Sequence, residues 1–125
     1  LKWLGHVHDQ ELLNQLWSNA GVYVHGHSVG GTNPALLQAL GAGAPTLALD
    51  TVFNREVVEY DEQLYPSDAK VLGQMIRETL ADPDRRNLWA SRGKETVRLR
   101  YSWPDVAERY LGALNEAADR RRRMK

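Results

Sequence analysis

Apolar residues recur at two spacings along this chain, and the two spacings predict alternating strands and helices. Short apolar runs predict strands over Leu1–Leu4, Val22–His25 and Pro45–Asp50. Apolar residues three and four positions apart predict helices over residues 10–17, 34–40, 68–80, 83–97 and from 103 onward. This alternation favours parallel strands joined by helices, and therefore an α/β fold.

Polar residues and glycines indicate where these segments begin and end. Asp9 and Asn33 stand directly before helical stretches as N-cap residues, and Pro34 suits the first turn of the second helix. Gly41 and Gly43 predict the end of that helix. Residues 51–66 show little periodicity and predict a long connection.

The composition is that of one globular domain. The 125 residues, of which 42% are hydrophobic and 26% charged, suit a single core. Sixteen basic residues balance sixteen acidic ones, so the net charge gives no reason to expect a nucleic-acid partner. The absence of cysteine excludes disulfides and thiolate metal sites and is compatible with a reducing, cytoplasmic location. No apolar run approaches the roughly 18 residues of a membrane-spanning helix.

The first residues are apolar and resemble the middle of a strand, not the start of a domain. Three or four strands are also few for a well-covered, doubly wound sheet. We therefore expect residues 1–125 to be a single domain cut from a longer chain, with earlier strands preceding Leu1.

The loop between the second predicted strand and the following helix is the most informative segment. It comprises Gly26-His27-Ser28-Val29-Gly30-Gly31-Thr32-Asn33. Glycines let backbone approach a ligand closely, and the helix that begins at Pro34 offers free N–H groups to an anion. These features suit a diphosphate, although the loop matches neither the dinucleotide fingerprint nor the P-loop. The alternative is a tight turn before a well-capped helix.

This segment resembles the donor site of a known enzyme family. Residues 28–45, with the run Gly-Thr-Asn-Pro at positions 31–34, are similar to retaining glycosyltransferases of the glycogen-synthase-like superfamily (glycosyl transferases group 1), in a variant resembling rhamnosyltransferases. Three further segments resemble family segments in the same order: residues 3–16, 53–57 and 101–110. The resemblance implies the C-terminal, donor-binding half of a GT-B fold, a partial Rossmann-like parallel sheet with flanking helices, closed by a helix over residues 101–120.

The resemblance also implies a function and a site. The whole enzyme would transfer a sugar from a nucleoside-diphosphate sugar to an acceptor, with retention at the anomeric carbon and without a metal or other cofactor. A missing N-terminal domain would bind the acceptor, and basic residues upstream would grip the diphosphate. The implied donor-binding residues are His27, Ser28, Gly30, Gly31, Thr32, Asn33 and Gln38. Secondary candidates are Asp50, Asn54 and Glu56, and no catalytic residue is assigned.

Two positions depart from the family's pattern. The family carries a pair of glutamates eight positions apart, where this chain has Gly30 and Gln38. A glutamine can still hydrogen-bond a ribose hydroxyl, but more weakly than a carboxylate. Two alternatives therefore stay open: a non-catalytic binding or partner module of the same fold, and a GT-B nucleotide-sugar epimerase. We expect the domain to be inactive in isolation.

Other candidate chemistry has a simpler interpretation. His25 and His27 could share a metal, but no third ligand stands nearby in the sequence, so His27 is better interpreted as lining the donor pocket. Glu56 and Asp50 also have alternatives to ligand binding. The Glu56 carboxylate could be stabilised by the dipole at a helix N-terminus, and Asp50 could cap the turn that follows its strand. Arg120–Arg123 could contact an anionic membrane surface, at the inner face for a cytoplasmic enzyme, or could be a solvated helix end. The aromatic stripe from Trp103 to Tyr110 predicts core packing. The resemblance implies that this last helix can cross back to the N-terminal domain, which would leave part of it exposed here.

Overall fold

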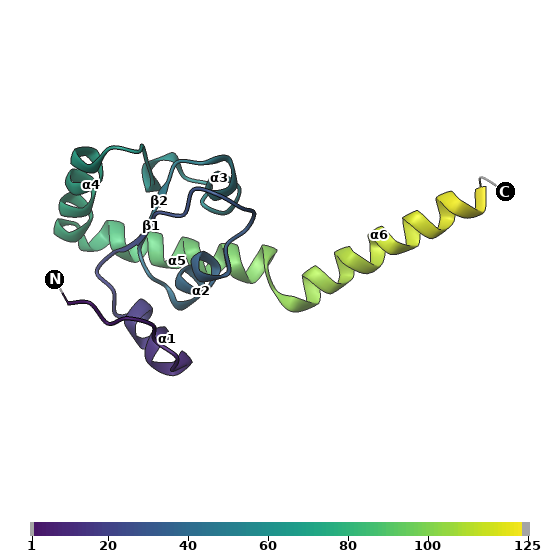
Figure 1. The fold of residues 1–125 in the computed structure, drawn as a ribbon, viewed down its shortest axis with the longest axis horizontal. Helices are drawn as coiled ribbons and strands as arrows, with labels where there is room; N and C mark the ends of the chain where they lie inside the picture. The colour runs from purple at the N-terminus through teal and green to yellow at the C-terminus, as the bar shows by residue number, and fades with distance from the viewer. Residues whose placement is uncertain (1, 124–125) are drawn as a thin grey trace.

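The structure, a computed structural model, describes residues 2–123 as a small parallel sheet surrounded by helices (Figure 1). The helices are α1 (Gln10–Ser18), α2 (Pro34–Ala42), α3 (Val52–Val57), α4 (Ala69–Ala81), α5 (Pro83–Arg100) and α6 (Trp103–Arg123). The strands are β1 (Tyr23–His25), β2 (Thr46–Leu49) and β3 (Leu64–Tyr65), with a 3-10 turn, η1 (Asp61–Gln63), before β3.

The three strands run parallel in the order β1-β2-β3. Tyr23 lies opposite Thr46, and Ala48 lies opposite Leu64 on the other side. The central strand β2 is covered on both faces, which explains why its sequence shows no alternation of apolar and polar residues. The predicted α/β architecture with a parallel sheet is therefore confirmed.

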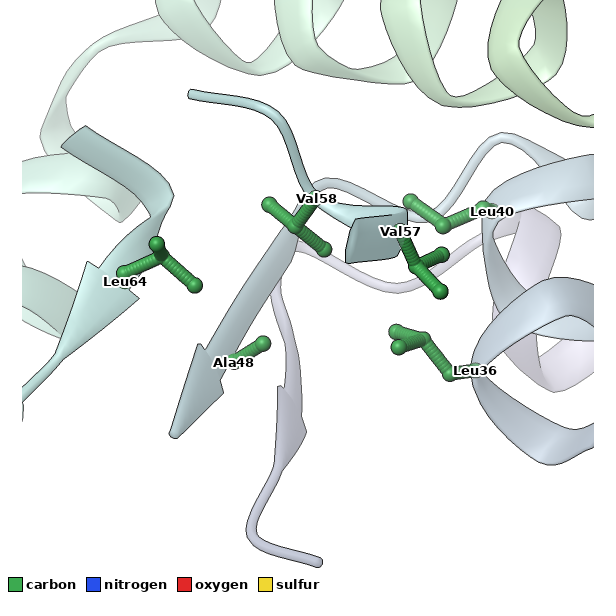
Figure 2. Packing of buried hydrophobic residues seen from close by; sticks show 6 residues of the cluster. All are labelled: Leu36, Leu40, Ala48, Val57, Val58 and Leu64. Atoms are coloured by element: carbon green, nitrogen blue, oxygen red, sulfur yellow. The ribbon is translucent and has the colours of Figure 1, made fainter. Parts of the chain in front are cut away.

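One face of the sheet packs against α2 and α3. Figure 2 shows Leu36 and Leu40 of α2 turned toward Val57 and toward Ala48 of β2, with Val58 and Leu64 completing the cluster. All six side chains are buried, at 8% exposure or less. The opposite face is covered by α4 and α5: Trp89 packs with Leu47 and Tyr65. The central strand is thus packed on both faces, and α5 contributes to both, since its Val97 and its C-cap Tyr101 pack against the cluster around Leu36.

Helix α2 is also clamped from its sides. Trp17 of α1 packs with Ala39 of α2 and with Ala44 just beyond it. On the other side, α5 approaches α2 closely at Gly93. A Cβ at this position would lie 2.9 Å from Leu40 Cδ2 and 3.2 Å from the Leu40 carbonyl oxygen. The second half of α2 is consequently packed against both α1 and α5.

The predicted helix ends agree with the structure. The carboxylate of Asp9 accepts hydrogen bonds from the backbone at the start of α1, and Asn33 accepts one from the Ala35 amide at 2.9 Å. Gly43 ends α2 with a φ of 84°, a conformation that favours glycine, whereas Gly41 lies inside the helix.

The first predicted strand is wrong. Residues 2–4 are not in a strand, and Trp3 and Leu4 are exposed; Leu1 lies outside the described residues. A strand needs a neighbour that completes its backbone hydrogen bonds, and residues 2–4 pair with no strand in the described chain. The second predicted strand begins at Tyr23, not Val22. It is an edge strand, so Val24 is 36% exposed and the strand is not fully buried as expected.

The connection over residues 51–66 is more ordered than its sequence suggests. It contains α3, η1 and β3. Thr51 caps α3 by accepting from the Asn54 amide at 3.1 Å, but the helix is too short to show periodicity. Burial of Val57, Val58 and Leu64 against α2 and β2 holds the segment, so tertiary packing decides its structure.

The last helix does not pack on the core as its stripe predicts. Helix α6 has no buried residue, and Figure 1 shows it extending away from the other elements. Trp103 is 86% exposed, and Tyr110, Leu111 and Leu114 are exposed as well. The expectation of core packing is wrong because the sheet faces are already covered by α2, α4 and α5, which leaves the stripe nothing to pack on within the described residues.

Candidate functional site

The loop over residues 26–33 begins at the carboxyl end of β1 and ends at the first turn of α2. Every residue from Gly26 to Thr32 is exposed, and Asn33 is half-buried. In parallel sheets, ligands bind at this edge, beyond the carboxyl ends of the strands. The predicted donor-binding residues from His27 to Asn33 are therefore brought together on one accessible segment.

A buried amide fixes this loop to the next one along the sheet. Asn54 Nδ2 donates to the His27 carbonyl oxygen at 3.0 Å and to the Leu49 carbonyl oxygen at 2.8 Å. The Asn54 side chain is only 4% exposed. Asn54 was predicted as a secondary ligand-binding residue, and its amide N–H groups are instead used to join the segments that follow β1 and β2.

A second long-range contact fixes the start of the loop. The Tyr65 hydroxyl of β3 donates to the His25 carbonyl oxygen at 3.3 Å, and a Cβ at Gly26 would lie 3.4 Å from that hydroxyl. Sequence reasoning missed Tyr65. Its signal was an aromatic residue in a short apolar run before Pro66, which gives no indication of a partner 40 positions away.

The turn into α2 has the conformation that its glycines suggest. Gly30 has a φ of 97°, in the region that favours glycine, and neither Gly30 nor Gly31 has an atom within 4 Å of the place where a Cβ would lie. The Asn33 side-chain oxygen is occupied by the Ala35 amide. In the first turn of α2, Pro34 has no N–H, and the amides of Ala35 and Leu37 both donate to Asn33. The Thr32 hydroxyl and the backbone N–H groups of the exposed loop are left as donors toward a ligand.

Four rings form a ladder along β1 toward the loop. Trp17 contacts Tyr23, Tyr23 contacts His25, and His25 contacts His27, with ring centroids 6.0–6.3 Å apart. Tyr23 and His25 share one face of β1 because side chains alternate along a strand, and His27 follows in the loop. His25 and Tyr65 were not predicted as site residues, and the alternation of rings was the signal that could have found His25.

The His25 side chain is only 5% exposed, and one of its two ring nitrogens has no hydrogen-bond partner among the described residues. Its Nδ1 lies 3.1 Å from the Tyr23 hydroxyl, whereas Nε2 is buried without a hydrogen-bond partner in the described residues. Burial, with a further contribution from His27, holds the pKa of the His25 imidazole below its ordinary value. Burial also raises the pKa of the Tyr23 hydroxyl.

Fixed positive charge is absent from the loop. Residues 3–54 contain neither lysine nor arginine, so the first basic side chain after the loop is Arg55. Arg55 is occupied: Nη2 donates to Asp50 at 2.7 Å, and Nη1 donates to Asp61 at 2.7 Å. The hydrogen bond from Arg55 holds the pKa of the Asp50 carboxyl below its ordinary value. Asp50 thus pairs with Arg55, and the capping role considered for it belongs to Thr51.

Two further predicted residues lie away from the loop segment. Gln38 is exposed one turn into α2 and lines a shallow groove of about 450 Å³ beside α1, together with Glu11, Asn14, Gln15, Ser18, Gly41 and Ala42. Glu56 is exposed in the last turn of α3. It is therefore not at a helix N-terminus, and the dipole interpretation considered for it is wrong.

Two other properties concern the described residues as a whole. No group of three or more His, Cys, Asp or Glu side chains lies close enough to hold a metal ion within residues 2–123. No helix over that range is long and apolar enough to cross a membrane. A cavity of about 730 Å³ between α4 and α5 has a mostly acidic rim and includes no residue of the loop.

Comparison of the chain with protein-family models, with curated proteins and with solved structures found no match.

Proposed function

We propose that the loop over residues 26–33 and the start of α2 bind the diphosphate of a nucleoside-diphosphate sugar, and that the whole protein is a glycosyltransferase. The observation that carries the proposal is the exposed glycine-rich loop, which joins the carboxyl end of a parallel strand to a helix N-terminus. A second supporting observation is the buried His25 ring, whose Nε2 has no hydrogen-bond partner among the described residues and whose centroid lies 6.1 Å from that of His27 in the loop.

The arrangement suits a leaving diphosphate. Gly30 and Gly31 have open space where side chains would stand, so a phosphate oxygen can approach their backbone. The hydrogen bonds from Asn54 and Tyr65 hold the preceding carbonyls, which keeps the loop in place without ligand. Donors placed in advance stabilise the charge that develops on the diphosphate as the sugar leaves, without reorganisation at that moment.

Gln38 would contact the nucleotide ribose in this proposal. It stands one turn beyond the loop, in the groove shared with α1. A ribose lying over the start of α2 would bring its hydroxyls to this groove while the diphosphate stays at the loop. The proposal therefore has the nucleotide extending from the loop toward α1.

Nucleotide titration followed by NMR tests the site. UDP, GDP and dTDP are added separately, and we expect amide shifts concentrated in residues 26–38. Thr32→Val and Gln38→Ala should each weaken binding several-fold, since a hydrogen bond of this kind contributes about 0.5–1.5 kcal/mol. Ser91→Ala, an exposed change on α5, is the matched control. No shift in residues 26–38 with any of the three nucleotides would reject the site.

The departures from the family's acidic pair favour a second candidate, a non-catalytic module of the same fold. Gly30 and Gln38 supply no carboxylate where the resembled enzymes have two. The full-length protein distinguishes the candidates: sugar transfer or donor hydrolysis indicates a transferase, and interconversion of donor sugars indicates an epimerase. Binding without any turnover indicates the module.

We also propose a cytoplasmic protein in which Arg120–Arg123 contact an anionic membrane surface. These residues end α6 and are all exposed. Arg120 and Arg122 lie 4.0 and 3.9 Å from the carboxylates of Glu116 and Asp119, so their charge is only loosely paired. Co-sedimentation with vesicles containing phosphatidylserine should be stronger than with neutral vesicles and should fall with added salt.

A further inference from the structure

A site for a diphosphate needs positive charge, and the loop contains no lysine or arginine to supply it. A diphosphate carries negative charge at any pH near neutrality, but residues 3–54 contain no lysine or arginine. Arg55 is held by Asp50 and Asp61. The side chains of this part of the chain that can become positive are histidines, and two of the four stand where β1 meets the loop: His25 and His27.

Resting on the proposed function, we propose that His25 and His27 form the cationic component of the diphosphate site and take up a proton when the anion binds. Their ring centroids lie 6.1 Å apart, with His25 at the end of β1 and His27 two positions further on in the loop. His25 is buried with Nε2 unpartnered, and His27 is exposed at the first turn of the loop. The His27 ring is therefore accessible to a ligand, and the buried His25 ring lies next to it.

The surroundings of the pair leave it neutral until an anion arrives. On β1 its ionisable neighbour is Tyr23, whose hydroxyl contacts His25 Nδ1. Helix α2 and strand β2 carry no titratable side chain, and β3 contributes Tyr65, which bonds to the His25 carbonyl oxygen. The titratable groups on the remaining neighbours are Asp9 and Glu11 at the start of α1, and Asp50, Arg55 and Glu56 before and within α3.

No carboxylate hydrogen-bonds either ring among the described residues, so a bound diphosphate would be the first close counter-charge for the pair. An opposite charge within about 4–6 Å favours the protonated imidazole, and by linkage protonation then favours the anion. Burial disfavours the charged form of His25 in the free protein, in agreement with its lowered pKa. Binding should therefore strengthen as the pH falls, by up to about tenfold per pH unit for one proton taken up.

Isothermal titration calorimetry of the 125-residue chain tests this inference. UDP-glucose, GDP-mannose and dTDP-glucose are suitable probes because both ends of the diphosphate are esterified, so the ligand itself does not titrate near neutral pH. Titrations at about pH 6.5 in buffers with different heats of ionisation give the number of protons taken up. We expect net uptake, and an affinity about three- to tenfold higher at pH 6.5 than at pH 7.5.

Variants assign the proton to the pair. His27→Gln is exposed and should fold normally, and it should lose at least half of the uptake and flatten the pH dependence. His25→Gln is the second variant, with its fold checked by circular dichroism. His6→Gln is the matched control in an exposed segment outside the loop, and it should bind like the parent chain.

The outcomes separate the two proposals. Binding with no proton uptake, or uptake that persists when both His25 and His27 are changed, overturns the role of the pair and leaves the donor site standing. Failure of all three probes to bind between about pH 6 and 8 overturns the donor site itself. Uptake that disappears in His27→Gln and persists in His6→Gln supports the pair.

Discussion

Asn54 Nδ2 donates to the carbonyl oxygen of His27, a residue 27 positions earlier in the chain, at 3.0 Å. The same amide nitrogen donates to Leu49 at 2.8 Å. One buried side chain thus ties the loop after β1 to the end of β2. This relationship, more than the loop's own sequence, holds the candidate site in a single conformation.

Asn54→Ala should therefore destabilise the protein and loosen the loop. Two carbonyls would lose their protein donor, and a buried unsatisfied polar group costs about 1–3 kcal/mol. Urea unfolding measures the change. Asn87→Ala, at an exposed position of α5, is the control and should stay within about 0.5 kcal/mol of the parent. Equal effects of the two changes would contradict the anchoring role of Asn54.

The adjacent glycines of the loop should respond differently to alanine. Gly30 has a φ of 97°, and a side chain in a left-handed conformation costs about 1–2 kcal/mol. Gly31 is not in that conformation and has open space around it, so Gly31→Ala should change stability by less than about 0.5 kcal/mol. Thermal unfolding of the pair checks this, and a larger loss for Gly31→Ala than for Gly30→Ala would contradict the turn described.

Gly93→Ala should separate α2 from α5. The added methyl would lie 2.9 Å from Leu40 Cδ2 and 3.2 Å from the Leu40 carbonyl oxygen, and overpacking of this kind costs about 1–3 kcal/mol. Gly73→Ala in α4 meets only the far end of Arg77, at 3.6 Å, and should stabilise by about 0.5–1 kcal/mol through helix propensity. Chemical denaturation of both variants tests the contrast; stabilisation by Gly93→Ala would refute the close approach of the two helices.

The free energy of unfolding should decrease as the pH is lowered, and part of this decrease should come from His25. The pKa of this imidazole is lowered in the folded state, so the unfolded chain binds the extra proton first. The stabilising contribution is therefore present above the unfolded value of about 6.5 and is lost as the pH falls through it. The stability difference between the parent and His25→Gln should be larger at about pH 7.5 than at about pH 5.5. A difference independent of pH would show that His25 does not titrate as described, and His6→Gln serves as the control.

Substitution of a core leucine by alanine should destabilise the protein far more than the same change in α6. Leu36 is fully buried between α2 and the sheet, and Leu36→Ala should cost about 2–5 kcal/mol. Leu114 on α6 is 50% exposed, and Leu114→Ala should cost less than about 0.5 kcal/mol. Guanidinium unfolding measures both. A large loss at Leu114 would mean that α6 is packed against something in solution.

The sequence predicted the elements that carry their own local signals. Asp9, Asn33 and Gly43 define helix ends through hydrogen bonds to backbone groups within a few positions, so those boundaries agree with the structure. The run around Leu47 predicted a strand covered on both faces, as observed. The strand at Leu4 failed because pairing depends on a neighbour that the local pattern does not contain.

In the candidate site, too, some features could be predicted from the sequence and others depend on long-range contacts. The glycines and exposed polar residues from His27 to Thr32 were visible as a loop, and the structure places them together at the sheet edge. Tyr65 could not be recognised, because its role is a hydrogen bond across the sheet to the His25 carbonyl oxygen. Asn54 was a secondary candidate for ligand binding, and in the structure its amide is buried and donates to backbone carbonyl oxygens.

By itself, the sequence determined the alternation of strands and helices, the caps of α1 and α2, and the loop with its missing lysine and arginine, because these follow from residue types a few positions apart. Only the tertiary structure decided that Asn54 and Tyr65 anchor the loop, that His25 is buried beside His27, and that α6 stands free. The physical reason is that burial and long-range hydrogen bonds depend on which surfaces meet. A short chain segment specifies its own backbone preferences, but not the partner that covers it.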